Sequence, residues 1–351
     1  MSASGTEPTA VAEPDAAETT EPQDTVPWFQ RFMERIGPFW TLGVLILLIV
    51  AFGIAASSLY TKDAWESTAT YAVEYLLLAI GETFVIITGG IDLSVGAMLG
   101  FSGMAGALVA QHMLGVHDSS TLTTIVTILV MLACGTALGL INGLLITLLK
   151  LPPFIVTLGT LTGITGGINL LNGGNEVSIL PAPINSLGID SVLNGWLPLP
   201  VLISIVLAVV FGFVLARTRF GLRTYAIGSN ETATRRAGIR VDRHLVRVYA
   251  LSGFLAGVAG LMVTANLSTA APINGQNDEL YAIAAVVIGG ASIFGGTGTI
   301  FGTVIGTAIL AVLTTGLVLT NVQPFWQQVA IGAVVIIAVA VDRVRTKAGT
   351  D

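Results

Sequence analysis

The chain has 351 residues, of which 53% are hydrophobic and 10% are charged, and its mean hydropathy is +0.84. Soluble domains carry about 25% charged residues, so this composition excludes a soluble protein and predicts one embedded in a lipid bilayer. The net charge of −6 argues against nucleic-acid binding. The single Cys134 excludes a disulfide framework and a cysteine-based metal site, and we expect no metal and no cofactor.

The acidic residues are concentrated near the N-terminus. Seven of the 21 acidic residues precede Ile36, in a segment rich in Pro, Ala, Thr and Glu. Such a segment buries too little apolar surface to fold alone, so residues 1–35 are predicted to be a disordered cytoplasmic tail. The segment lacks the basic start and short apolar core of a signal peptide, so we expect the first apolar run to be a retained span. Residues 348–351 are predicted to be a short C-terminal tail.

Apolar runs of membrane-spanning length fill the region between the tails, residues 36–347. A spanning helix needs about 20 apolar residues, and ten candidate runs are present. They predict an all-α, polytopic helix bundle of about ten transmembrane helices, some of them broken by glycines. The runs are Phe39–Leu59, Tyr71–Thr88, Val95–Met113, Leu122–Leu149, Phe154–Leu171, Leu199–Ala216, Val248–Ala265, Leu280–Ile293, Thr299–Leu319 and Phe325–Val341.

The basic residues predict the orientation, because Lys and Arg prefer cytoplasmic loops. With ten spans and both termini in the cytoplasm, 14 of the 15 basic residues fall inside and only Lys62 falls outside. Eight arginines lie in one inward loop, residues 217–247. We therefore expect cytoplasmic N- and C-termini and a strongly charged cytoplasmic loop.

The centre of that loop is predicted to be a short helix, because it has capping residues at both ends. Asn230 is a suitable N-cap and Glu231 suits the positive end of the helix dipole. Arg235 and Arg236 suit the negative end, and Gly238 suits the position just beyond the C-cap. These signals favour a docking helix, and the alternative is an ordinary positively charged cytoplasmic loop.

Glycines recur at four-residue spacing within several runs, a pattern that lets helix backbones approach closely in lipid. Three stripes are predicted to pack in this way, at Gly135/Gly139/Gly143, Gly159/Gly163/Gly167 and Gly253/Gly257. A longer pattern, Gly89, Gly90, Gly96 and Gly100, repeats at Gly295, Gly296, Gly302 and Gly306, with Tyr75/Tyr281 and Ala79/Ala285 upstream. This echo at an offset of 206 residues is either an internal repeat, as in many transporters, or a chance similarity of glycine-rich stretches.

Polar residues inside the apolar runs are costly and face an interior or a cavity. The candidates are Glu82, Asp92 with Ser94, Asn142, Asn169 and Asn266. Asp92 is close enough in sequence to accept hydrogen bonds from the amides of Ser94 or Val95, so we expect it to cap a helix start.

Enzymatic motifs are missing from the sequence. There is no Gly-x4-Gly-Lys-Ser/Thr loop for nucleotide hydrolysis and no His-Glu-x-x-His pair. Gly100-Phe101-Ser102-Gly103 matches the pattern of intramembrane serine proteases, but no histidine lies mid-span to activate the serine. We expect a protein that is not an enzyme.

Several motifs follow one another along the chain. They are Thr88-Gly-Gly-Ile-Asp-Leu-Ser-Val-Gly96, Gly139-Leu-Ile-Asn-Gly143, Leu151-Pro-Pro-Phe-Ile-Val-Thr-Leu158, Ala226-Ile-Gly-Ser-Asn230 with Gly238-Ile239, Glu279-Leu280, Ile283-Ala-Ala-Val-Val-Ile-Gly-Gly290, Phe294-Gly-Gly-Thr-Gly298 and Ala338-Val-Ala-Val-Asp342. Together they resemble the membrane permease subunits of bacterial ribose-type ABC sugar importers. An acidic residue usually follows the Glu-Leu of the eighth span in that family, whereas Tyr281 stands here. We therefore do not transfer pentose specificity.

The resemblance implies a permease of the bacterial inner membrane that works as a dimer, and we expect a homodimer in contact with lipid. It implies two partner proteins, a cytoplasmic ABC ATPase and an extracytoplasmic sugar-binding protein, and no nucleic acid. The family's coupling segment maps onto Asn230, Glu231, Thr232, Ala233, Arg235, Arg236 and Gly238.

These observations favour a monosaccharide import permease that works by alternating access. Candidate residues of the sugar path are Asp92, Ser94, Asn142, Asn169 and Asn274, whose neutral or acceptor groups suit hydroxyl-rich ligands. Structural roles are expected for Glu82, Gly89, Gly90, Gly96, Pro152, Pro153, Gly295 and Gly296. Two alternatives stay open: a branched-chain amino acid permease of the same superfamily, and an ion-coupled secondary transporter, for which only Glu82 could bind the ion.

Overall fold

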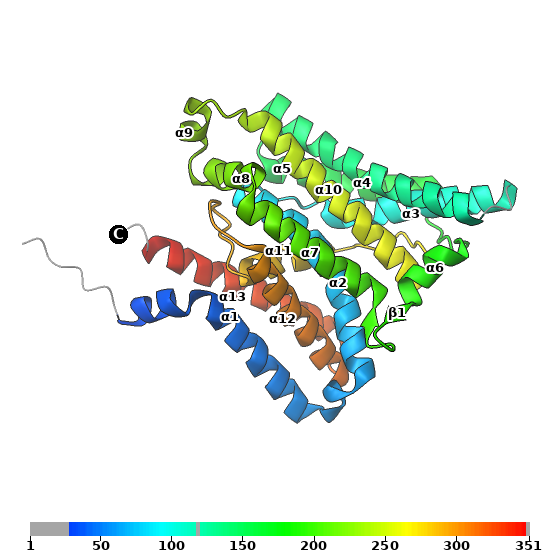
Figure 1. Ribbon diagram of the computed structural model, residues 1–351, viewed down its shortest axis with the longest axis horizontal. Helices are drawn as coiled ribbons and strands as arrows, with labels where there is room; N and C mark the ends of the chain where they lie inside the picture. Colours follow the sequence, from blue (N-terminus) through cyan, green and yellow to red (C-terminus); the bar gives the residue numbers. More distant parts are fainter. Residues whose placement is uncertain (1–27, 117–119, 349–351) are drawn as a thin grey trace, which may run out of the picture. The chain divides into compact units, whose positions relative to one another are not determined.

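The fold is almost entirely helical in the computed structural model, which describes residues 28–116 and 120–348 (Figure 1). The chain divides into two units, residues 1–37 and 38–351. Two 2-residue strands, β1 (Ser191–Val192) and β2 (Leu197–Pro198), pair antiparallel. The helices are α1 (Trp28–Ala55), η1 (Ser57–Tyr60), α2 (Lys62–Ile87), α3 (Val95–Val116), α4 (Ser120–Leu149), α5 (Pro153–Asn172), α6 (Ala182–Ile189), α7 (Leu199–Arg217), α8 (Arg219–Ser229), α9 (Glu231–Arg236), α10 (Val241–Leu267), α11 (Asp278–Ile288), α12 (Ile300–Leu319) and α13 (Pro324–Ala348).

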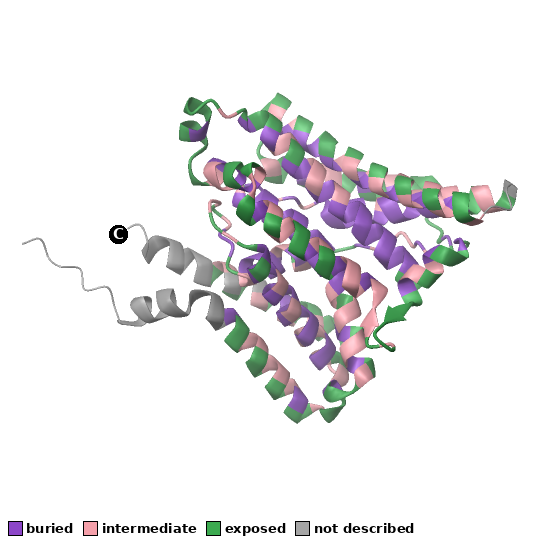
Figure 2. Ribbon diagram, in the orientation of Figure 1, coloured by how far each residue is buried: buried purple, intermediate pink, exposed green. Residues whose placement is uncertain are grey.

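Seven of the described helices are long and apolar enough to cross a membrane: α2, α3, α4, α5, α7, α10 and α12. They confirm a polytopic helical membrane protein. Burial separates these helices into central and peripheral ones (Figure 2). In the most apolar stretch, 83% of α10 and 72% of α2 are buried, against 22% each of α4, α5 and α7. The centre of the bundle is therefore built around α2 and α10.

Helix boundaries differ from the predicted runs where polar residues extend a helix beyond its apolar part. We predicted the second span to begin at Tyr71, but α2 begins at Lys62, where the Thr61 side chain caps the amide of Ala64. In the same way α10 begins at Val241 rather than Val248, because its first turns carry charged residues. Helix α1 begins at Trp28, within the predicted tail, and residues 1–27 lie outside the described part of the chain.

The eighth predicted run, Leu280–Ile293, is wrong at its C-terminal end. Helix α11 has 11 residues and ends at Ile288, where the glycine-rich stretch 289–298 begins. Eleven residues reach about 16 Å, roughly half of a 30 Å hydrocarbon core. The ends of this element were hard to predict because apolar residues continue beyond the last helical turn.

Two of the three glycine stripes pack closely, as predicted. Gly135 and Gly139 on α4 face Gly253 on α10, and a Cβ added at Gly139 would overlap the backbone of Tyr249. A Cβ at Gly143 would lie 2.7 Å from the Cα atom of Val246. Figure 1 shows the two helices side by side, α4 in green-cyan and α10 in yellow-green. The bare glycine surfaces let the two backbones touch along several turns.

The third stripe does not pack within the chain, so the prediction is wrong there. A Cβ added at Gly159 or Gly163 on α5 would meet nothing within 4 Å, and one at Gly167 would only reach the ring of Phe101. Four-residue glycine spacing marks a smooth helix face, but it does not tell which neighbour, if any, covers that face.

The two halves of the glycine echo meet in space. The amide of Gly296 donates to the carbonyl oxygen of Ile87 at 2.9 Å, so the break after α2 and the break after α11 are joined. Tyr75 and Tyr281, the upstream members of the echo, stack with ring centroids 4.5 Å apart and planes at 6°. The glycine-rich breaks thus form one junction in the bundle.

Candidate functional site

A buried polar network holds the break between α2 and α3. Glu82 Oε1 accepts a hydrogen bond from the Asp92 amide at 3.0 Å, and Asp92 Oδ1 accepts from the Ser94 amide at 3.0 Å and the Ser94 hydroxyl at 2.6 Å. Asn142 Nδ2 on α4 donates to Ser94 Oγ at 2.8 Å. The predicted capping role of Asp92 is confirmed, and Asn142 ties the break to α4.

This network is sealed from the cavities described below. Glu82, Asp92, Ser94 and Asn142 each have 0% exposed surface, and none of them borders either cavity. Four of the network's side-chain atoms are buried without a hydrogen-bond partner among the described residues: Glu82 Oε2, Asp92 Oδ2, Asn142 Oδ1 and the nearby Tyr249 hydroxyl. The geometry therefore places Asp92, Ser94 and Asn142 at a structural junction rather than on an open surface in this conformation.

Sequence reasoning missed Tyr249, which lies where this network approaches the first cavity. A Cβ at Gly90 would lie 2.5 Å from the Tyr249 hydroxyl, so glycine at this position leaves room for the ring. Tyr249 borders the first cavity, and its ring is fully buried. A lone aromatic residue in an apolar run is typical of a packed core, so the sequence carries no signal for this position.

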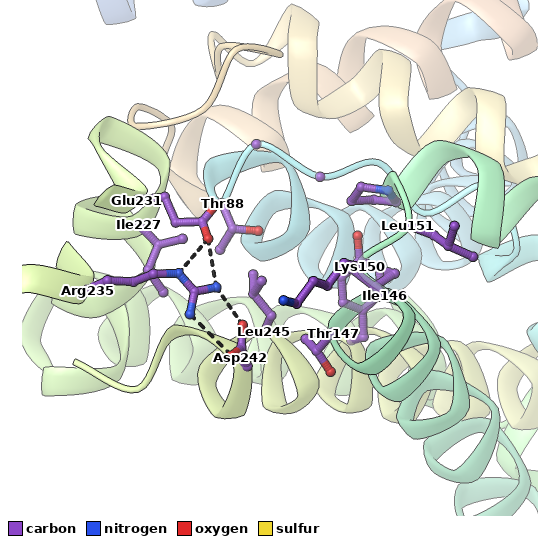
Figure 3. Close-up of a pocket in the computed structure, with 14 residues that line it drawn as sticks. Thr88, Ile146, Thr147, Lys150, Leu151, Ile227, Glu231, Arg235, Asp242 and Leu245 are labelled. Carbon is purple, nitrogen blue, oxygen red and sulfur yellow. Dashed lines mark hydrogen bonds and ion pairs between the residues drawn. The ribbon is translucent and has the colours of Figure 1, made fainter. Parts of the chain in front are cut away.

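The first cavity has a volume of about 580 Å³ and lies between α9 and the ends of α4 and α10 (Figure 3). We call it the α9 cavity. Gly89 and Gly90 form part of its wall, together with Lys150, which follows α4, and Pro153 at the first turn of α5. Pro152 is the N-cap of α5, so this proline pair starts the helix beside the cavity, consistent with the structural role expected for it.

Helix α9 confirms the predicted capped helix. The Asn230 side chain accepts a hydrogen bond from the Ala233 amide at 2.9 Å. At the other end Gly238 has φ +81°, and the amides of Gly238 and Ile239 donate to the carbonyl oxygens of Arg235 and Thr234. This is a Schellman ending, which needs a residue that tolerates positive φ. Glu231, Thr232, Ala233, Arg235 and Arg236 are exposed, and only Thr234 is buried.

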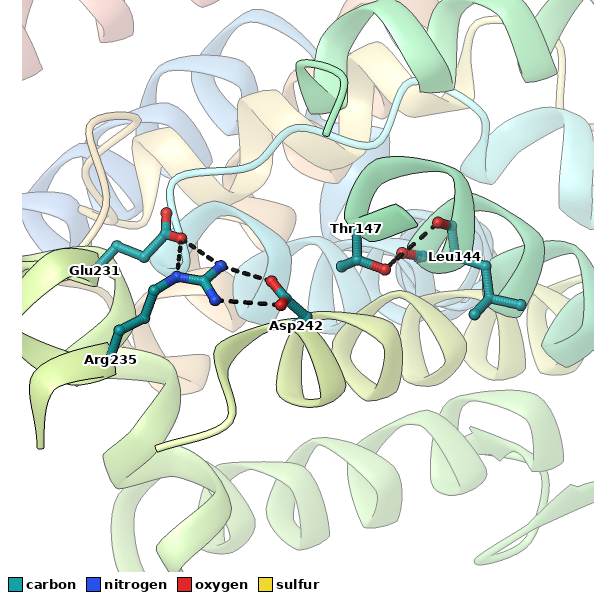
Figure 4. A network of polar contacts seen from close by, with 6 residues as sticks. Leu144, Thr147, Glu231, Arg235 and Asp242 are labelled. Carbon is teal, nitrogen blue, oxygen red and sulfur yellow. Dashed lines mark hydrogen bonds and ion pairs between the residues drawn. The ribbon is translucent and has the colours of Figure 1, made fainter. Parts of the chain in front are cut away.

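An ion-pair network fastens α9 to α10 (Figure 4). The Arg235 guanidinium donates to both carboxylate oxygens of Asp242, at 3.2 Å and 2.5 Å. It also donates to Glu231 Oε1 from Nε at 2.9 Å. The hydrogen bonds to Asp242 and Glu231 raise the pKa of Arg235 above its ordinary value. The bidentate fork fixes direction as well as distance, so α9 is oriented relative to the start of α10.

Helix α8 links this end of the bundle to the glycine junction. A Cβ at Gly228 would overlap the carbonyl of Ile87 and would lie 2.5 Å from the Gly296 amide nitrogen. The Tyr225 hydroxyl donates to the carbonyl oxygen of Gly298 at 2.7 Å. Gly295 and Gly296 have φ of +89° and +80°, which suits glycine. One short helix therefore touches both glycine-rich breaks.

The second cavity, about 530 Å³, lies between the C-terminal half of α5 and the segment 272–279. We call it the α5 cavity. It brings together Asn169 and Asn274, two residues singled out from the sequence that are 105 positions apart. Six of its thirteen lining residues carry neutral hydrogen-bonding side chains, namely Thr162, Thr165, Asn169, Asn274, Gln276 and Asn277. One charged side chain, Glu279, joins them, and the sequence had marked it only as part of a motif.

The two cavities follow one another along α5. Pro153 borders the α9 cavity, and residues from Leu161 to Asn169 border the α5 cavity. Eight helical residues, about 12 Å, separate Pro153 from Leu161. The α5 cavity therefore begins near the middle of the helix and extends toward its C-terminal end.

Comparisons with known proteins identify the family of the chain. A family model described as "Branched-chain amino acid transport system / permease component" matches residues 65–339. The ribose import permease protein of Bacillus subtilis is 40% identical over 90% of this chain and 94% of its own length. The D-allose transport system permease protein of Escherichia coli is 37% identical over 91% and 94%, and the galactose/methyl galactoside import permease protein of the same species is 33% identical over 90% and 96%. No solved structure matches the chain significantly.

Proposed function

Since the chain belongs to the family of the branched-chain amino acid transport system permease component, we propose that it is the membrane permease of an ATP-driven importer that carries a monosaccharide into the cytoplasm. The similarity to three permeases that are each named for a sugar carries this proposal, because it extends over nine-tenths of the chain. The relatives are transport subunits, and this chain likewise performs no covalent chemistry. A separate ABC ATPase hydrolyses ATP.

Helix α9 is the proposed docking element for that ATPase. Its exposed side chains, Glu231, Thr232, Ala233, Arg235 and Arg236, offer a polar surface, and the caps at Asn230 and Gly238 keep the helix formed. Movement of α9 reaches α10 through the Arg235–Asp242 pair and reaches the glycine junction through α8. These rigid contacts support a mechanism in which ATPase closure switches the bundle between inward- and outward-facing states.

The α5 cavity is the proposed outward section of the sugar path, with Asn169 and Asn274 as hydrogen-bonding residues. Asp92, Ser94 and Asn142 act by positioning the start of α3, whose residue Ala97 borders that cavity. Gly96 leaves room for Gly275 and Glu279, and Gly89, Gly90, Gly295 and Gly296 shape the junction that moves. We further propose ten membrane-embedded segments, cytoplasmic termini, a bacterial inner-membrane location, a homodimer and an extracytoplasmic sugar-binding protein that delivers the ligand.

Reconstituted transport tests the proposal. The permease, reconstituted in vesicles with its partner ATPase and sugar-binding protein, is given labelled D-ribose, D-allose, D-galactose or L-leucine. We expect ATP-dependent uptake of one of the sugars. Uptake of leucine alone would identify an amino acid permease, and sugar uptake driven by an ion gradient without ATP would identify a secondary transporter. The sealed position of Glu82, hydrogen-bonded to the Asp92 amide, speaks against the ion-coupled alternative.

A further inference from the structure

We infer that Glu279 is a sugar-recognition residue of the permease itself, and that its carboxylate accepts hydrogen bonds from ligand hydroxyl groups in the α5 cavity. The inference rests on the proposed function, because it assigns a ligand class and a selectivity residue to the same path. Glu279 lies in the first turn of α11 and borders the cavity together with Asn169 and Asn274.

One carboxylate oxygen of Glu279 has no hydrogen-bond partner among the described residues. Glu279 has 6% exposed surface, and its Oε2 is buried without a hydrogen-bond partner among the described residues. An unpaired buried carboxylate oxygen is costly, so a donor from outside the chain would stabilise it. The terminal torsion of a glutamate side chain is broad, which allows either oxygen to turn toward a ligand in the cavity.

Space beside Glu279 depends on a glycine. A Cβ added at Gly96 would lie 2.5 Å from Glu279 Oε2, and it would also overlap the carbonyl oxygen of Gly275. Gly96 thus lets the carboxylate lie between the start of α3 and the cavity. The sequence had assigned Gly96 a structural role, and the structure shows which side chain benefits from it.

The chemistry of the cavity wall selects for polyols over anions. No lysine, arginine or histidine is among the residues that border the α5 cavity, and Glu279 is its single charged residue. A ligand carboxylate would meet like charge without a counter-ion, which disfavours sugar acids and the carboxylate of an amino acid. Sugar hydroxyls supply the donors that Glu279 needs, and such charge-assisted bonds are stronger than neutral ones.

The neighbouring carboxylate offers a matched control. Asp278 is in the same helical turn and is similarly buried, at 8% exposed surface, but it does not border the cavity. Charge removal at Asp278 and at Glu279 therefore perturbs the same helix start, while only Glu279 can touch a ligand.

Ligand-observed NMR on the purified full-length permease in lipid nanodiscs tests the inference, with D-ribose and D-allose as probes and D-ribonate as the anionic comparison. We expect the wild-type permease to bind D-ribose or D-allose but not D-ribonate. Glu279→Gln should weaken sugar binding by at least about tenfold. Asp278→Asn should bind the sugar as the wild type does. Glu279→Gln should also narrow the difference between D-ribose and D-ribonate. If Glu279→Gln does not fold, Glu279→Asp takes its place; its carboxylate is withdrawn by one methylene, so sugar binding should weaken, while the retained charge should still exclude D-ribonate.

Equal binding by wild type and the folded Glu279 variant would overturn the inference, as would equal weakening by Asp278→Asn. The same holds if wild type binds none of the sugars while the reconstituted importer transports one; that result leaves the proposed function standing. The opposite result is also informative. If sugar binding depends on Glu279 but the reconstituted complex transports no sugar, the proposed function is wrong and the inference about Glu279 stands.

Discussion

At the residue scale, the break between α2 and α3 shows why a few polar groups are retained in an apolar bundle. Asp92 caps α3 from inside the network, Glu82 holds the Asp92 amide, and Asn142 reaches across from α4. The free backbone groups of a broken helix cannot bond to lipid, so side chains must satisfy them. The polar residues therefore supply hydrogen bonds to the broken helix ends and do not line an open channel.

Removal of the cross-helix donor should destabilise the protein modestly. For Asn142→Ala we expect a loss of about 1 kcal/mol in unfolding free energy. Hydrogen bonds between helices in membranes contribute slightly less than this on average. The loss of a donor to Ser94 and Asp92 adds to the cost, because their buried acceptor atoms lose a hydrogen-bond partner. Denaturant unfolding in detergent measures the change. Asn266→Ala, at an exposed end of α10, is the control and should be close to neutral. Equal losses in the two variants would contradict a specific role of the network.

At the element scale, the same glycine spacing has two outcomes. The stripe on α4 lies against α10, whereas Gly159 and Gly163 of the stripe on α5 face none of the residues that the structure describes. Helix α9 is the opposite case, since its start and end are both set by residues within a few positions of it. Local signals predicted α9 fully, whereas the partner of a glycine face depends on how distant helices dock.

The two stripes should respond differently to alanine. Gly139→Ala forces α4 away from α10, and we expect a cost of about 1–3 kcal/mol, as for other overpacked sites. Gly163→Ala adds a methyl group in open space on α5 and favours the helix, so stability of the isolated chain should be unchanged or slightly higher. Thermal unfolding in detergent compares the pair. A larger loss for Gly163→Ala would contradict the packing described here.

The Arg235 network should matter for coupling more than for stability. Arg235 and Asp242 are 45% and 56% exposed at the side chain, and exposed ion pairs contribute about 0.2–1 kcal/mol. For Arg235→Gln we therefore expect a nearly unchanged melting temperature but several-fold lower sugar uptake per ATP hydrolysed, because α9 is no longer held to α10. Arg243→Gln, an exposed arginine in the first turn of α10 with no ion pair among the described residues, should keep normal coupling.

At the scale of the whole molecule, the charged loop and the two cavities follow one another along the bundle. The loop with eight arginines includes α8 and α9, beside the α9 cavity, and the α5 cavity begins at Leu161, about 12 Å along α5 from Pro153. An ATPase docked at α9 and a sugar bound in the α5 cavity would therefore be coupled through the same packed helices.

Site-directed labelling tests the predicted orientation. In a Cys134→Ser background, we expect a membrane-impermeant maleimide to label Glu176→Cys in intact cells and Thr232→Cys only in inverted vesicles, since both positions are exposed on the chain. The expectation follows from the preference of basic residues for the cytoplasm. Labelling of Thr232→Cys in intact cells would reverse the assigned topology.

Much of the fold could be predicted from the sequence, and part of the site could not. Each of the ten apolar runs overlaps a helix, because hydropathy is a property of neighbouring residues in the sequence. Helix α11 was overextended, since apolar residues continue past its last turn into the glycine break. Asn169 and Asn274 were chosen separately as polar residues, and nothing in the sequence indicated that they share a cavity with Glu279.

The sequence by itself determined the membrane class, the positions of most helices and the capped helix α9, because hydropathy and capping act over one helix or one turn. The tertiary structure decided which glycine faces are buried, how Glu82, Asp92, Ser94 and Asn142 assemble, and which residues line each cavity. These features join residues that are tens to hundreds of positions apart. Their distances depend on how whole helices pack, and helix packing in lipid is governed by surface shape, which periodicity alone does not encode.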